Sequence, residues 1–249
     1  MKKIIIGNWK MQLNLRDAGR LAARLSSSVL GKKAGKNEVV VCPDYLALPF
    51  AAKVLRGGKI KLGAQDCAGA QRGAMTGEVS PADLKDLGVK YVIIGHSERR
   101  EHLHENSAVI NAKIKAALAK KLVPVLCVGE KLAERRSGQT RPYLNGELSR
   151  ALHGVKIASA ADLIIAYEPV WAISGARGAR PLDSAEAGVI QQFIKAKATL
   201  LLKKAPRVIY GGSVNVVNAS SLLAEKNVDG LLVGSASLRS QEFIEICSQ

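Results

Sequence analysis

The sequence predicts an α/β protein in which eight parallel strands alternate with eight helices and close into a (β/α)₈ barrel. Short apolar runs recur along the 249 residues, with helix-forming stretches between them. Most of these runs are apolar throughout rather than alternating, as in Tyr91 to Ile94 and Leu231 to Val233. Such runs are typical of parallel strands that are buried on both faces. Eight strand–helix units in about 250 residues fit a closed barrel.

The expected elements follow one another along the whole chain. Strands are expected near residues 3–9, 38–42, 59–65, 90–95, 122–128, 162–168, 206–211 and 228–234. Helices are expected near residues 14–30, 44–56, 81–87, 105–120, 141–152, 184–204, 215–224 and 238–247. In the fourth helix, Ile110, Ile114 and Leu118 fall at i, i+4 and i+8 and define one apolar face. Ser80 before Pro81 supplies an N-cap hydroxyl and a first-position proline for the third helix.

An open, doubly wound sheet is the alternative architecture. That fold commonly carries a G-x-G-x-x-G turn after its first strand, and this sequence has none there. No linker and no shift in composition divides the chain. We therefore expect a single domain over residues 1–249.

The net charge of +16, from 37 Lys and Arg against 21 Asp and Glu, raises the question of a nucleic-acid partner. The basic residues are spread along the whole chain, and aromatic residues make up only 4% of it, too few for base-stacking platforms. The sequence favours a solvated basic surface over a nucleic-acid-binding one. Such a surface would also attract a small anionic substrate.

Targeting and redox signals are weak. No apolar run approaches the about 18 residues that a transmembrane helix needs, and only three isoleucines follow Lys3, too few for a signal peptide. We expect a cytoplasmic protein without a membrane partner. The scattered cysteines indicate buried, reduced thiols rather than a disulfide framework or a zinc site. They are Cys42, Cys67, Cys127 and Cys247.

Chemically capable side chains follow several of the expected strands. Asn8 and Lys10 follow the first strand, His96 follows the fourth and Glu168 ends the sixth, while glycine turns follow the seventh and eighth. Each of these alone has an ordinary structural explanation. In a closed barrel, however, the carboxyl ends of all strands meet at the face where active sites lie. The sequence therefore predicts one ring of amide, ammonium, imidazole and carboxylate groups.

The segment after the sixth strand combines rigid and permissive residues. Glu168 is followed by Pro169 and Trp171, and then by small residues and glycines up to Pro181. This pattern indicates a carboxylate on a stiff element, followed by a loop with ordered ends and a mobile middle. A loop of this kind can close over a substrate and exclude water.

Seven segments together carry a family resemblance. They read, in chain order, GNWKM (7–11), TGE (76–78), GHSERR (95–100), VGE (128–130), YEPVWAI (167–173), YGGSV (210–214) and VDGLLVG (228–234). In this order and spacing the sequence resembles triosephosphate isomerase over most of its length. The resemblance implies a TIM barrel that interconverts dihydroxyacetone phosphate and glyceraldehyde 3-phosphate, with no metal or organic cofactor, in a homodimer.

The resemblance also implies a role for each group at the strand ends. Glu168 matches the base that moves a proton between adjacent carbons, and His96 matches the neutral imidazole that polarises the carbonyl. Lys10 supplies fixed positive charge near the developing oxyanion, and Asn8 supplies a further donor. Glu98 resembles the family's buried carboxylate near Lys10, and Cys127 lies among the surrounding residues.

The phosphate of the substrate is expected on backbone N–H groups of the last three loops. These groups belong to Ser174, Gly175, Ser213, Gly234 and Ser235. Two of these loops depart from the family pattern. The usual Gly-Thr-Gly is replaced by Ser174-Gly175-Ala176, and one of two glycines is replaced by Ser235, so positive φ angles are restricted in the first and room beside the phosphate is reduced in the second.

The long loop 65–79 is expected to make the dimer. In the family this loop enters a pocket of the neighbouring subunit. Thr76 would then approach the Asn8 to Lys10 region of that subunit, and Glu78 would pair with Arg99 across the interface.

Two alternatives remain open from the sequence. One is a different phosphosugar isomerase or an aldolase on the same barrel, although no Schiff-base lysine or metal-ligand set is evident. The other is a basic nucleic-acid-binding or adhesive protein on an inactive barrel, which would bind nucleic acid in a salt-sensitive manner.

Overall fold

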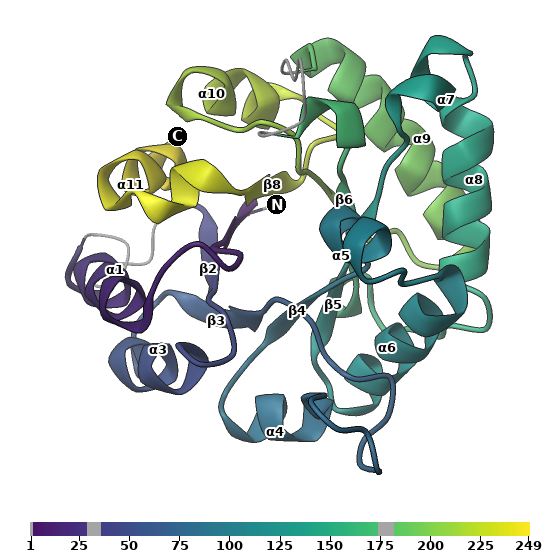
Figure 1. Cartoon of the computed structure of the whole chain (residues 1–249). Coiled ribbons are helices and arrows are strands. Elements are labelled where there is room, and N and C mark those ends of the chain that lie inside the picture. The colour runs from purple at the N-terminus through teal and green to yellow at the C-terminus, as the bar shows by residue number, and fades with distance from the viewer. Residues whose placement is uncertain (1, 29–35, 174–181) are drawn as a thin grey trace.

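The computed structural model describes residues 2–28, 36–173 and 182–249, and it confirms the predicted (β/α)₈ barrel. The strands pair in parallel and in chain order, and β1 closes the barrel by pairing with β8 (Figure 1). Their bounds are β1 Ile4–Asn8, β2 Glu38–Cys42, β3 Lys61–Ala64, β4 Tyr91–Ile94, β5 Val123–Val128, β6 Ile164–Tyr167, β7 Arg207–Tyr210 and β8 Gly230–Val233.

The helices surround the barrel as an outer layer (Figure 1). The α-helices are α1 Leu15–Ser27, α3 Leu48–Leu55, α4 Pro81–Asp86, α5 Ser97–His102, α6 Ser107–Ala119, α7 Leu132–Arg136, α8 Thr140–Ala151, α9 Ser184–Leu202, α10 Val216–Ala224 and α11 Ser240–Ser248. Three short 3₁₀ segments are η1 Ala160–Asp162, η2 Val170–Ala172 and η3 Ser235–Leu238.

The observed elements differ from the predicted ones in three places. The second helix begins at Leu48 rather than at residue 44, with Pro49 in its first turn. The last helix begins at Ser240, because η3 occupies the preceding residues. Helices α5 and α7 were not predicted. Neither contains a buried residue, so neither presents the apolar face on which the prediction depended.

Two apolar layers explain why the strands are uniformly apolar. Alternate strand residues such as Ile6, Val40 and Ile93 point into the barrel and pack on one another there. The residues between them, such as Ile5 and Val92, pack against the helices. The cysteines are free and buried, as expected. Both strand faces are therefore desolvated, as in other parallel sheets.

The closure between β1 and β8 requires a glycine. Gly230 lies opposite Ile4 in the register, and a Cβ at Gly230 would come within 1.9 Å of the Ile4 carbonyl oxygen. A side chain at this position would push the first and last strands apart.

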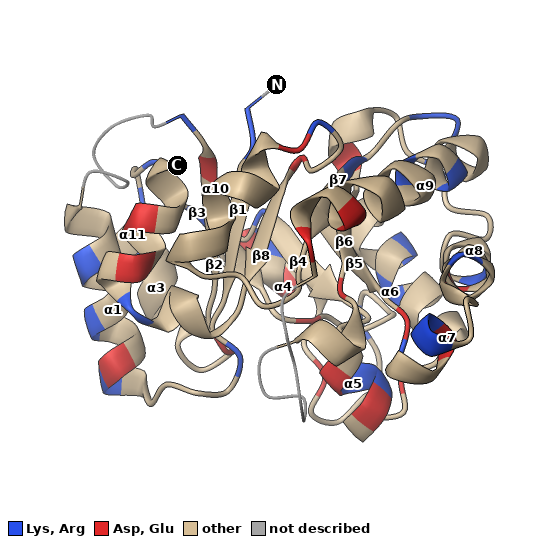
Figure 2. Cartoon of the chain, turned by 90° about the horizontal axis from the view of Figure 1, so that it is seen from above, with Lys and Arg blue, Asp and Glu red and all other residues tan. Residues whose placement is uncertain are grey.

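The parallel topology gives the barrel two distinct faces. Connections from strand to helix lie on the C-terminal face, which carries α5 and α7, and connections from helix to strand lie on the N-terminal face (Figure 2). The sequence-predicted site residues belong to the first set.

Candidate active site

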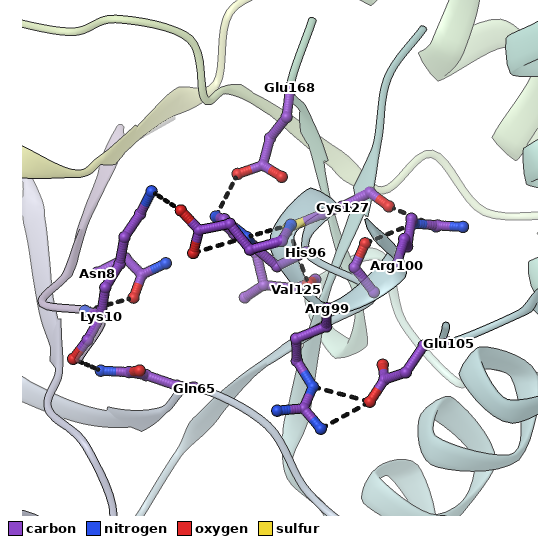
Figure 3. Close-up of polar contacts among 12 residues, drawn as sticks. Asn8, Lys10, Gln65, His96, Arg99, Arg100, Glu105, Val125, Cys127 and Glu168 are labelled. Carbon is purple, nitrogen blue, oxygen red and sulfur yellow. Dashed lines mark hydrogen bonds and ion pairs between the residues drawn. The ribbon is translucent and has the colours of Figure 1, made fainter. Parts of the chain in front are cut away.

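A pocket at the C-terminal face of the barrel brings together four of the predicted groups. Asn8, Lys10, His96 and Glu168 all line it, although they come from β1, the β1–α1 connection, the end of β4 and the end of β6. The remaining lining residues are Gln12, Ile173, Gly211, Gly212, Val214, Leu232, Gly234 and Ser235. Figure 3 shows the four side chains converging from different strands.

Glu168 is held by its neighbours on both sides. Its backbone N–H donates to the Val128 carbonyl at 2.8 Å, and a Cβ at Gly129 would lie 1.7 Å from its carbonyl oxygen. A Cβ at Gly211 would lie 2.8 Å from its Cγ. The two glycines therefore create the space in which this carboxylate sits. The side chain is only 3% exposed.

His96 is oriented by the short helix that follows it. It is the N-cap of α5, and its Nδ1 accepts a hydrogen bond from the Glu98 backbone N–H at 3.2 Å. Because Nδ1 acts as an acceptor, the ring proton of the neutral imidazole lies on Nε2. Nε2 lies 3.3 Å from Oε1 of Glu168 (Figure 3). The Nε2–H group of the imidazole therefore points into the pocket.

Lys10 has an unusual backbone conformation that is stabilised by neighbouring amides. Its φ is +51°, which few residues other than glycine adopt. Its backbone N–H donates to Oδ1 of Asn8 at 3.1 Å, and its carbonyl accepts from Nε2 of Gln65 at 2.9 Å. These bonds fix the direction in which the ammonium side chain leaves the backbone.

The ammonium group of Lys10 lies 2.5 Å from Oε1 of Glu98 (Figure 3). Burial opposes ionisation of Glu98, but the hydrogen bond from Lys10 and the electrostatic effects of His96, Lys10 and His102 together outweigh it and hold the pKa of this carboxyl below its ordinary value. Glu98 is therefore ionised at neutral pH. Glu98 contacts Lys10 as expected, but its side chain is 46% exposed, so the expectation that this carboxylate is buried was wrong.

Cys127 forms part of the wall beneath the carboxylate. It is buried on β5, and burial together with the nearby charge of Glu168 raises the pKa of its thiol well above the ordinary value. The thiol is neutral, and nothing in its surroundings activates it as a nucleophile. A hydrogen bond between this thiol and the Glu168 carboxylate contributes to the same rise in pKa.

The phosphate-binding residues are only partly brought together. Gly234 and Ser235 line the pocket, with Gly234 beside the Lys10 side chain. Ser213 does not line it, because its backbone N–H and its hydroxyl both donate to the Ala172 carbonyl, at 2.9 and 2.8 Å. Ser174 and Gly175 lie outside the described residues.

A buried carboxylate that sequence reasoning did not assign holds the segment after β6. Glu130 accepts hydrogen bonds from the Tyr167 hydroxyl at 3.1 Å and from Trp171 Nε1 at 3.0 Å. Its carbonyl accepts from the Val170 N–H at 3.0 Å. The VGE motif indicated Glu130 as a residue at a strand end, but not these partners. They anchor the entrance to the loop that follows.

Arg100 was also missed as a structural element of the site. Its guanidinium donates to the carbonyls of Gly95 and Cys127 at 2.6 and 2.8 Å, and it lies 3.0 Å from Oε1 of Glu147. It thereby ties the ends of β4 and β5 together behind the pocket. The GHSERR segment showed that an arginine is present here, but not which groups its guanidinium contacts.

The predicted interface residues lie away from the pocket of their own chain. Thr76 and Glu78 are exposed on loop 65–79, which projects beside α4 (Figure 1). Arg99 bonds within its own chain, to Glu105 at 2.7 Å and Asp66 at 2.9 Å.

Comparison with known proteins gives consistent results. The sequence model of the triosephosphate isomerase family matches residues 3–249. Triosephosphate isomerase of Thermoanaerobacter pseudethanolicus is 41% identical over 251 residues, covering 98% of each chain. That of Dehalococcoides mccartyi strain CBDB1 is also 41% identical, covering 100% of this chain and 97% of its own. A crystal structure of triosephosphate isomerase from Bartonella henselae matches with a TM-score of 0.85 and 36% identity, over 99% of this chain and 98% of that one.

Proposed function

Because the chain belongs to the triosephosphate isomerase family and is an isomerase of triose phosphates, we propose that the pocket at the C-terminal face is its active site. The observation that carries this proposal is the contact between Oε1 of Glu168 and Nε2 of His96 at 3.3 Å, inside a pocket that Lys10 also lines. A base, a proton donor and a fixed positive charge then surround one small volume.

In this proposal Glu168 is the base. Its carboxylate takes the proton from the carbon next to the carbonyl of dihydroxyacetone phosphate, and an enediolate forms. The same group returns the proton to the adjacent carbon and gives glyceraldehyde 3-phosphate. The low exposure of the side chain supports this role, because bulk water is kept away from the proton while it is transferred.

His96 and Lys10 stabilise the charge that develops on the substrate oxygens. The imidazole donates its Nε2 proton to those oxygens, and the ammonium group provides a positive charge that is present throughout the reaction. Asn8 adds a neutral donor. Glu98 and Cys127 touch these groups rather than the substrate, and act by positioning them.

The phosphate of the substrate is proposed to lie beside Gly234 and Ser235, next to the side chain of Lys10. The N–H of Ser213 joins it once the bond to the Ala172 carbonyl is released. Ser174 and Gly175 complete the proposed set from the loop that follows η2.

We also propose a homodimer formed through loop 65–79. The chain exposes several large apolar side chains in and around this loop and the connections after β1 and β2, a distribution that marks an interaction surface. They are Met11, Leu15, Leu46, Phe50 and Met75. In the dimer, Thr76 approaches the active site of the other subunit. Glu78 of one subunit pairs with Arg99 of the other. Within its own chain, Arg99 already contacts Asp66 and Glu105.

A cytoplasmic location and a single domain over residues 1–249 complete the proposal. Among the described helices, none has the length and apolar character required to cross a bilayer. Strand pairing runs without interruption from β1 to β8, which supports one folding unit.

The test is turnover of glyceraldehyde 3-phosphate by purified protein in a coupled assay, with Glu168→Gln as the variant. The wild type is expected to be active, and the variant is expected to lose roughly 10²–10⁴ in kcat, since removing a general base has this effect. Glu101→Gln, an exposed carboxylate on α5, is the matched control and should keep full activity. Near-normal turnover by Glu168→Gln would contradict the assigned mechanism.

The dimer is tested separately by sedimentation and by dilution. Thr76→Arg places a bulky charge on the tip of the exposed loop and should yield monomers with little activity. A monomeric variant with full activity would contradict the proposed interface while leaving the assignment of the pocket intact.

A further inference from the structure

Part of the positive charge that is scattered along the sequence lies on one face of the fold. Every connection that leads from a helix into a strand, including the segment before β1, carries at least one exposed or half-buried Lys or Arg. The exposed ones are Lys2, Lys36, Arg56, Lys59, Lys90, Lys121, Lys156, Lys203, Lys204 and Lys226, and the exposed Lys61 at the start of β3 and Lys85 near the end of α4 lie beside them. Because all these connections meet at the N-terminal face, we call this set the N-terminal basic face. Figure 2 shows Lys and Arg along the edge that carries the N-terminus.

The carboxylates of the same connections are largely engaged within the chain. Glu38 accepts from the Tyr91 hydroxyl and lies 3.2 Å from Nη1 of Arg207. Asp229 lies 2.8 Å from Nζ of Lys195, and Asp162 accepts the backbone N–H groups that begin η1. Asp86, the last residue of α4, is exposed beside these connections, and Glu225 in the connection before β8 is half-buried. The positive charge of this face is therefore only partly compensated.

Helix geometry accounts for only some of these cations. The C-terminal ends of the helices point to this face, and cations are favourable there. Lys85 Nζ donates to the Lys121 carbonyl at 3.1 Å in this way. The side chains of Arg56, Lys61 and Lys121 make no hydrogen bond or ion pair with any described residue. They are free to contact an external anion.

An open groove between α3 and α4 lies on this face. It encloses a volume of about 420 Å³, and its lining includes Arg56, Lys61, Lys85 and Lys90. Its apolar floor includes the buried side chain of Ile60. No Asp or Glu lines this groove. A series of anionic groups placed along the rim of this groove would therefore contact four cationic side chains.

We propose that the N-terminal basic face binds the phosphate backbone of duplex nucleic acid, without reading its sequence, at the face opposite the active site. A broad surface on which Arg56, Lys61 and Lys121 are free to contact anions matches a series of phosphates, and binding of this kind is driven by release of counterions. The positions of the most exposed apolar side chains favour nucleic acid over a lipid surface as the partner of this face. Those with the highest exposure, Met11, Leu46 and Val217, lie on the C-terminal side and cannot insert into a membrane that docks on this face.

The test is fluorescence anisotropy with a labelled DNA duplex of about 20 base pairs at roughly 50–200 mM salt. The first variant is the triple substitution Arg56→Gln, Lys61→Gln and Lys121→Gln on the basic face. The matched control is Arg16→Gln, Arg136→Gln and Arg141→Gln, which removes the same charge from exposed residues on α1, α7 and α8. None of these six residues belongs to the active site, so both variants should keep full isomerase turnover. That turnover also reports that each variant is folded.

The wild type should bind the duplex with a dissociation constant in the range of about 10⁻⁴–10⁻⁶ M or tighter at low salt. The basic-face variant should lose at least about tenfold in affinity at the lowest salt and reduce the salt slope by about 2–3, while the control changes affinity by less than about threefold. Isomerase turnover should persist with the duplex bound, because the two faces are opposite. Absence of wild-type binding, an equal loss in both variants, or binding to phosphatidylglycerol vesicles but not to duplex would overturn the proposal.

Discussion

Asp66 is a buried carboxylate whose removal should stabilise the protein at neutral and alkaline pH. Its side chain is 4% exposed, and its Oδ2 lies 2.6 Å from Nζ of Lys113 and 2.9 Å from Nη2 of Arg99. Both cations are shared with Glu105, so Asp66 is not fully compensated. Burial therefore raises the pKa of Asp66 to about 6, although Lys113 acts in the opposite direction.

The magnitude follows from linkage between protonation and folding. The carboxyl has an ordinary pKa of 3.8 and a pKa of about 6 in the fold. At 1.36 kcal/mol per pH unit, the charged form destabilises the fold by about 3 kcal/mol relative to the protonated form. Because the folded-state pKa is raised, the stability associated with the protonated form is complete below about pH 4. It is lost as the pH rises through about 6.

The substitution Asp66→Asn resembles the protonated form at every pH. We expect a gain of up to about 3 kcal/mol in the free energy of unfolding at pH 8, roughly half of that at pH 5, and little below pH 4. The assay is urea unfolding at a constant protein concentration, because subunit association also contributes to apparent stability. Asp86→Asn, at an exposed position, is the control and should show no such pH dependence. A variant that is less stable than the wild type at pH 8, or a gain that does not vary with pH, would refute the reasoning.

Three further substitutions test the proposed active site. Gly211→Ala would place a methyl group 2.8 Å from Cγ of Glu168, so kcat should fall by about 10²-fold while thermal unfolding changes little. Lys10→Met should lower kcat by roughly 10²–10³-fold and raise KM, and an effect on KM alone would argue against its role at the oxyanion. Glu130→Ala leaves two buried donors without an acceptor and should lower the free energy of unfolding by about 2–6 kcal/mol, measured in urea.

The barrel and the main site groups could be predicted because both depend on strong local signals. A run of strand length that is apolar throughout indicates a strand buried on both faces, whichever strands it pairs with. A polar group directly after such a run is carried to the C-terminal face by topology alone, which is why Asn8, His96 and Glu168 were found. The prediction required the order of elements and no knowledge of their contacts.

The features that escaped prediction depend on contacts between distant segments. The bonds from Ser213 to the Ala172 carbonyl, and from Trp171 to Glu130, join residues about 40 positions apart. Helix α5 has no apolar face, and it is defined by the hydrogen bond between its N-cap His96 and the Glu98 N–H. The basic face is the clearest case, because its cations share one face only after the eight strand–helix units have closed the barrel.

The seam at which Ile4 meets Gly230 has a consequence for how the enzyme is made. A ribosome delivers the first strand long before its last neighbour exists, so β1 and the growing end of the sheet both carry unpaired edges during most of synthesis. Lys10, which follows β1, is synthesised before Gly234, which follows β8. A chain that lacks β8 could not place Gly234 and Ser235 beside Lys10, and its open sheet would keep two unpaired edges of the kind that promote aggregation.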